Sequence, residues 1–188
     1  IMEGLIFFDS HSTIGPRARK HPRERWTTEH LLEDMDLTEI AGALVVHNVA
    51  KSYDPIYGNE RLKNELLKAP GRLFGAWCIG PIGGPGFYST GDSMIKAMEE
   101  EDIRAVRLVP DGTVESGFPT DPIVMGKTFQ VLQHYQTFNF LLQISSRSVC
   151  DQIYKILETY DNSTMTPAHS ITDPLPKKKS GLCVKSYI

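Results

Sequence analysis

The sequence is poor in cysteine and contains no long apolar run, and both absences narrow what the chain can be. Its 188 residues include three cysteines, Cys78, Cys150 and Cys183, which lie far apart. An odd number at such spacing predicts neither a disulfide framework nor a Cys-x-x-Cys site, and it favours a reducing cytoplasm. No apolar stretch reaches the roughly 20 residues that a membrane-spanning helix needs.

Neither basic nor acidic residues are in large excess. Lysine and arginine number 20 against 23 acidic residues, which gives a net charge of -3. This balance gives no reason to expect nucleic acid or an anionic membrane as a partner. The hydrophobic fraction of 40% and the charged fraction of 23% are typical of a globular domain. We therefore expect one domain whose partner is a small-molecule substrate.

Strand-like and helix-like segments alternate along most of the chain. Apolar runs predict strands at residues 5–9, 43–47, 73–79, 105–109 and 138–144. Amphipathic segments predict helices at residues 27–38, 59–68 and 148–160, and two more that begin at Asp92 and at Asp121. Repeated βα units with continuous apolar strands predict a parallel sheet covered by helices. Five of the eight units of a (βα)8 TIM barrel fit this pattern, and so does a five-stranded doubly wound sheet.

The apolar period stops near residue 161, where a sixth strand is due. The remaining residues, 162–188, are rich in proline, serine and lysine and predict an irregular tail. We therefore divide the chain into a partial barrel domain, residues 1–161, and this tail. So abrupt a loss of pattern is what a reading-frame shift would produce, and we expect a chain truncated after its fifth unit. A truncated barrel leaves open sheet edges, which favour self-association into a homo-oligomer.

Polar side chains follow several of the predicted strands. Asp9 and His11 end the first strand, where His11 suits a proton carrier or metal ligand and Asp9 suits a group that orients it. Either residue can instead bond to neighbouring backbone. His47 ends the second strand and would share a pocket with His11 if both face the same rim. The alternative for His47 is a structural histidine.

Later strands add three candidates for substrate contact. Arg107, in the fourth strand, suits two-point binding of a carboxylate, and the alternative is an ordinary salt bridge. Trp77, near the end of the third strand, is a candidate pocket wall or a core residue. Gln143, in the fifth strand, is a candidate hydrogen-bonding wall. All would lie at the carboxyl ends of the strands.

Several stretches together resemble the amidohydrolase-related proteins of the amidohydrolase superfamily. They are the first strand with Asp9, His11 and Gly15, and residues 53–60, 70–77 and 103–108. The resemblance covers residues 4 to about 161. It implies a (βα)8 barrel that holds one or two divalent metals, usually zinc, on histidines of strands one, five and six and an aspartate of strand eight. It also implies hydrolysis, decarboxylation or hydration, with the metal activating a water.

The matched positions show how this chain departs from that pattern. His11 stands at the first histidine, Thr13 at the second, and Gln143 at the histidine of strand five. A hydroxyl and an amide are poor zinc ligands, so the resemblance leaves His11 as the one matched metal ligand. The expected function is that of a hydrolase-like protein acting on a small carbonyl-containing substrate. The alternative is a non-catalytic carboxylate-binding protein on the same scaffold.

Overall fold

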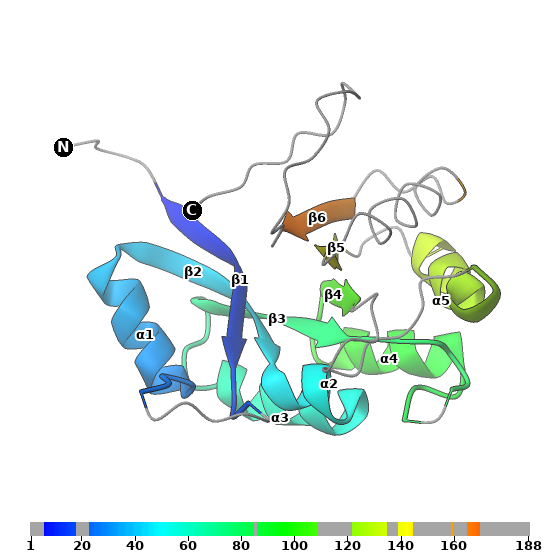
Figure 1. Ribbon diagram of the computed structural model, residues 1–188, viewed down its shortest axis with the longest axis horizontal. Coiled ribbons are helices and arrows are strands. Elements are labelled where there is room, and N and C mark those ends of the chain that lie inside the picture. The colour runs from blue at the N-terminus through cyan, green and yellow to red at the C-terminus, as the bar shows by residue number, and fades with distance from the viewer. Residues whose placement is uncertain are drawn as a thin grey trace.

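Six parallel strands form one sheet, in the order in which they follow one another along the chain (Figure 1). This computed structural model describes residues 6–17, 23–84, 86–108, 122–134, 139–144, 159 and 165–169, with backbone alone for the last two strands. The strands are β1 (Phe7–Ile14), β2 (Ile40–His47), β3 (Leu73–Cys78), β4 (Ala105–Leu108), β5 (Asn139–Ile144) and β6 (Met165–His169).

The sequential strand order decides between the two predicted architectures. In a doubly wound sheet the order in which strands are added reverses after the first strands. In a (βα)8 barrel each new strand is added on the same side of the previous one. Here each strand pairs in parallel with its successor from β1 to β6. The strands curve as part of a barrel, and the doubly wound alternative is therefore wrong.

Strand β6 corrects the prediction of an irregular tail. Its residues pair with β5 in continuous register, from Phe140 opposite Met165 to Ile144 opposite His169. The segment Met-Thr-Pro-Ala-His contains no apolar run, so its sequence does not predict a strand. Pairing with the neighbouring strand overrides that weak local preference. The sixth strand that the barrel pattern requires is thus present.

Within the described residues, five helices accompany the strands: α1 (Thr28–Leu37), α2 (Asn48–Ser52), α3 (Pro55–Leu66), α4 (Gly91–Glu100) and α5 (Pro122–His134). Helix α3 begins earlier than predicted because Asp54 caps it and Pro55 occupies its first turn. Thr90, rather than Asp92, caps α4. The helix predicted at residues 148–160 lies outside the described residues apart from Thr159. None of the described helices is long and apolar enough to cross a membrane.

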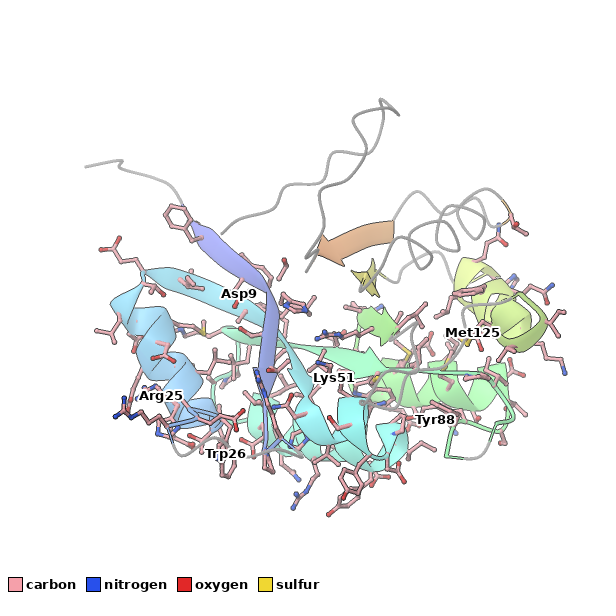
Figure 2. All side chains as sticks on the ribbon, viewed as in Figure 1. Asp9, Arg25, Trp26, Lys51, Tyr88 and Met125 are labelled. Atoms are coloured by element: carbon pink, nitrogen blue, oxygen red, sulfur yellow. The ribbon has the colours of Figure 1, made fainter. Side chains whose placement is uncertain are left out.

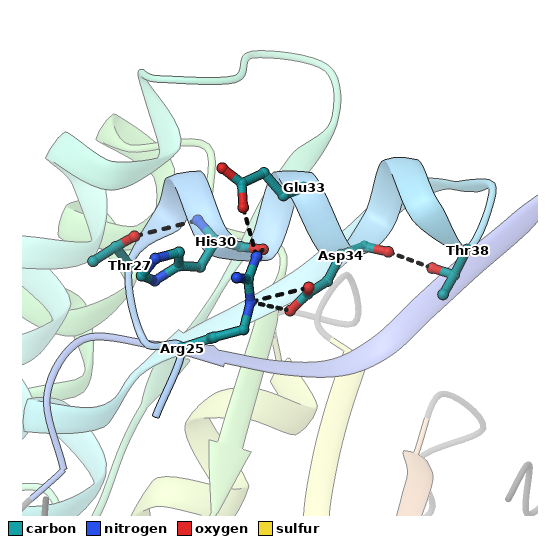
Figure 3. Close-up of polar contacts among 6 residues, drawn as sticks. All are labelled: Arg25, Thr27, His30, Glu33, Asp34 and Thr38. Atoms are coloured by element: carbon teal, nitrogen blue, oxygen red, sulfur yellow. Dashed lines mark hydrogen bonds and ion pairs between the residues drawn. The ribbon is translucent and has the colours of Figure 1, made fainter. Parts of the chain in front are cut away.

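Polar contacts at its start fix the direction of α1 (Figure 3). The Thr27 hydroxyl accepts a hydrogen bond from the His30 amide at 3.2 Å, which caps the helix. Arg25 forms ion pairs with Glu33 at 2.6 Å and with Asp34 at 3.1 Å. Solvent screens exposed ion pairs such as these, so they add little to stability and mainly orient the loop that leads from β1 into α1.

The two sides of the sheet carry different side chains. On the helix-facing side, alternate strand residues enter the main hydrophobic core with the helices. Strand members of this core are Ile14, Ala43, Val45, Leu73, Trp77, Val106 and Leu108, and helix members include Met35, Leu62, Met98 and Phe129. On the inner side, Leu44, Val46, Ala76 and Ala105 form a separate small cluster. The inner side is the side that a barrel encloses.

Candidate functional site

A bulge in β1 lies directly before the candidate site. Asp9 pairs with Ala43 and Ser12 pairs with Val45, so β1 advances three residues while β2 advances two. The Asp9 carboxylate accepts hydrogen bonds from the His11 amide at 2.8 Å and from the Ser12 hydroxyl at 2.5 Å. Bulges change the direction in which a side chain points. Asp9 thus holds the backbone that carries His11, and these two contacts involve no atom of the His11 ring.

The side chain of His11 lies within electrostatic reach of three charged residues: Asp9 on the same strand, Lys51 on α2 and Arg107 on β4. His11 is exposed, but partial desolvation by neighbouring atoms lowers its pKa below the usual 6.5, and the positive charge of Arg107 lowers it further. Asp9 opposes this shift and Lys51 adds to it. A histidine with a lowered pKa is neutral at pH 7, so it can accept a proton. His11 and Arg107, both predicted as site residues, therefore belong to one region.

Arg107 is almost completely buried in the middle of the sheet. Its side chain is 1% exposed, while its neighbours Val106 and Leu108 lie in the helix-side core. The alternation along a strand therefore places Arg107 on the inner side. It pairs with Cys78 of β3 and with Leu141 of β5. A planar guanidinium at this place suits two-point binding of a carboxylate.

Cys78, the last residue of β3, forms a neutral part of the same region. Burial raises the pKa of its thiol to about 11, although the positive charges of Arg107 and Lys51 oppose the rise. Asn59 fixes the backbone here, because its amide donates to the Cys78 carbonyl and accepts from the Cys78 amide, both at 3.0 Å. The thiol is therefore protonated at neutral pH and does not suit a nucleophile.

Lys51 is the site residue that the sequence analysis missed. It lies in α2, a five-residue helix that leaves the carboxyl end of β2 and was not predicted. The sequence signal for this site residue was a lysine four residues after His47, the histidine that ends β2. This pattern is too short to predict a helix. Ala50, the residue before Lys51, packs against Cys78.

His47 lies on the other side of the sheet from this region. Its Nδ1 accepts a hydrogen bond from the Val49 amide at 3.2 Å, which caps α2. Its ring packs against Gly15, where an added Cβ would lie 2.6 Å from Cε1 and Nε2. Burial lowers the pKa of His47, and the charge of Arg61 adds to the effect. The predicted pocket shared by His11 and His47 is thus absent from this part of the structure.

Three other residues were singled out in the sequence: Trp77 on β3, Thr13 on β1 and Gln143 on β5. Trp77 belongs to the helix-side core, where its ring stacks on Tyr88 with centroids 6.1 Å apart, so it does not line the inner side. Thr13 is half-buried and pairs with Val46 of β2. Gln143 pairs with Ala168 of β6, and its side chain lies outside the described part.

The described side chains do not fit a divalent metal. They contain no group of three histidine, cysteine, aspartate or glutamate residues that could hold a metal ion. The carboxylate of Asp9 already accepts two hydrogen bonds. Arg107 and Lys51 add positive charge where a cation would bind. We therefore derive no reaction step through a metal.

No family model matches this sequence, and no curated protein matches it either. Solved structures do match. A probable 2-pyrone-4,6-dicarboxylic acid hydrolase of Acinetobacter baumannii, with citric acid bound, is 15% identical with a TM-score of 0.58, over 87% of this chain and 58% of that one. The 4-oxalomesaconate hydratase of Rhodopseudomonas palustris is 13% identical with a TM-score of 0.55, over 86% and 62%.

An uncharacterized TIM-barrel protein of Bordetella bronchiseptica is 13% identical with a TM-score of 0.53, over 74% of this chain and 49% of that one. The hydrolase and the hydratase are TIM barrels of the amidohydrolase type. The chain spans about half to two-thirds of the length of these structures. At such low identity the likeness shows the fold. The predicted partial TIM barrel is confirmed.

Proposed function

We propose that this chain forms part of a hydrolase-like enzyme that acts on a small carbonyl-containing carboxylate at the inner side of the strand ends. The observation that carries the proposal is a buried arginine, Arg107, beside a histidine of lowered pKa, His11. The structural neighbours support it, since one is described as a dicarboxylic acid hydrolase with citric acid bound and another as a hydratase of 4-oxalomesaconate.

Each residue would have a distinct task in such a reaction. The Arg107 guanidinium would bind the carboxylate of the substrate and hold the carbonyl near His11. Neutral His11 would take the proton from a water molecule as its oxygen forms the new bond to the carbonyl carbon. Asp9 would act through the backbone of His11, because its carboxylate holds the bulge. The positive charges of Arg107 and Lys51 would stabilise the negative charge that develops on the carbonyl oxygen.

A non-catalytic carboxylate-binding protein is the second candidate. The observation that favours it is the lack of a three-ligand metal group among the described side chains. We expect purified protein to hold far less than one equivalent of zinc after dialysis against a weak chelator, as measured by elemental analysis. One tightly held equivalent would contradict this expectation and favour the metal-dependent hydrolase. Release of acid from an ester or lactone that carries a carboxylate would distinguish the enzyme from the binding protein.

Thermal unfolding with citrate as the probe tests the carboxylate site. Citrate well above its dissociation constant should stabilise the protein by about 1 to 3 kcal/mol through binding to the folded state. Arg107→Met should abolish this gain. Arg104→Met is the matched control, because Arg104 lies just before β4 and pairs with Asp102 at the surface, at 2.9 Å. An equal gain in the wild type and in Arg107→Met would reject the role of Arg107.

A further inference from the structure

Helix α2 is fixed tightly in place, and with it Lys51. The Asn48 amide donates to the Gly15 carbonyl at 2.6 Å, which ties the start of α2 to the end of β1. On the other side α3 approaches so closely that a Cβ on Gly58 would lie 2.0 Å from the Ala50 nitrogen. Lys51 follows Ala50 directly, toward the middle of the molecule (Figure 2). A short helix held on two sides gives the backbone of Lys51 a defined position.

Lys51 and Arg107 belong to two elements, α2 and β4, that both contact Cys78. Cys78 packs against Ala50 of α2 on one side and pairs with Arg107 of β4 on the other. The charges of Lys51 and Arg107 both lower the pKa of Cys78, and both lower the pKa of His11. Two cations thus act on one small region that also holds a neutral thiol and a neutral histidine.

We propose that Lys51 is a second anion-binding residue, and that together with Arg107 it selects ligands that carry two carboxylates. Two neighbouring cations repel each other, and a ligand with one negative charge offsets only part of that repulsion. A dicarboxylate places one charge on the Arg107 guanidinium and the other on the Lys51 ammonium. The inference rests on the proposed carboxylate site and adds the substrate class to it.

Calorimetric titration with succinate and butyrate tests the inference, because these acids share a carbon number and differ in their charge. Wild-type protein should bind succinate about ten- to a hundredfold more tightly, the range for a hydrogen bond to a charged group. Lys51→Gln should weaken succinate far more than butyrate and so remove this preference, and Lys51→Arg should retain it. Lys96→Gln is the control, since Lys96 lies exposed on α4.

The outcomes separate the inference from the proposed function. If butyrate and succinate bind equally and both depend on Arg107, the carboxylate site stands and the role of Lys51 is rejected. If Lys51→Gln weakens both acids alike while circular dichroism shows a folded protein, the selection for two carboxylates is rejected. If neither acid binds the wild type, the proposed function fails together with the inference.

Discussion

The inner side and the helix-facing side of the sheet contain the same residue types put to different uses. Each side has a histidine on a strand, His11 within β1 on the inner side and His47 at the end of β2 on the helix-facing side. Burial is the main cause of a lowered pKa in both. His47 caps a helix and packs on a glycine, whereas His11 lies within the electrostatic reach of Arg107 and Lys51. A histidine on a strand is therefore not by itself a site residue, because its side of the sheet decides.

The largest expected effect comes from removing a side chain on the helix-facing side. Trp77 is 4% exposed in the main core, so Trp77→Ala should lower the free energy of unfolding by about 3 to 5 kcal/mol. Phe74, on the same strand but the opposite side, is 47% exposed, and Phe74→Ala should cost about 1 kcal/mol or less. Denaturant unfolding measures both. Equal losses would show that the two sides do not differ as described.

Gly15 offers a second way to test the contrast. Its φ is +87°, and a Cβ there would collide with the His47 ring at 2.6 Å. Gly71 has a similar φ of +80° with nothing within 4 Å, so Gly71→Ala carries the backbone cost alone, about 1 to 2 kcal/mol. Gly15→Ala should destabilise the protein more than Gly71→Ala, as measured by denaturant unfolding. Losses of the same size would mean that His47 does not pack on Gly15.

Much of the fold could be predicted from the sequence because its strands are apolar runs. The first five strands appear where predicted, although β1 continues to Ile14, through a bulge that strand periodicity cannot reveal. Strand β6 has no apolar run, and its pairing with β5 is a long-range effect. Helix α2 has only five residues and depends on contacts with β1 and α3 rather than on helix propensity.

The candidate site could be predicted only in part. His11 and Arg107 were predicted because both end or occupy apolar strands, and whether they form a site stays a prediction. His47 was predicted on the wrong side, since a continuous apolar strand such as β2 shows no alternation from which its inner side can be read. For Trp77 the sequence left a pocket wall and a core position open, and its side chain lies in the helix-side core. Lys51 was missed because its position depends on the unpredicted α2.

Acid should destabilise the protein through its two histidines of lowered pKa. Below the usual pKa of 6.5, His47 of the unfolded chain binds a proton more readily than folded His47 does. The contribution of His47 to the free energy of unfolding is therefore complete above pH 6.5 and decreases as the pH drops below that value. His47→Asn should reduce this loss between about pH 7.5 and 5.5, because asparagine also caps helices but does not titrate. Denaturant unfolding at several pH values measures it. An unchanged loss would show that folded His47 takes up protons as readily as the unfolded chain.

The smallest effect is expected in the titration of the two histidines themselves, followed by NMR of the imidazole resonances. Arg107→Met removes a positive charge near His11 and should raise the pKa of His11. Asp9→Asn removes a negative charge and should lower it, while the asparagine oxygen still accepts from the His11 amide and keeps the bulge. Neither change should move the pKa of His47, whose charged neighbours are Arg61 and Glu65. Arg61→Met serves as the reciprocal control, because it should raise the pKa of His47 and leave His11 unchanged. A response of both histidines to Arg107→Met would mean that the sheet does not separate them, and the site would then have to include His47 after all.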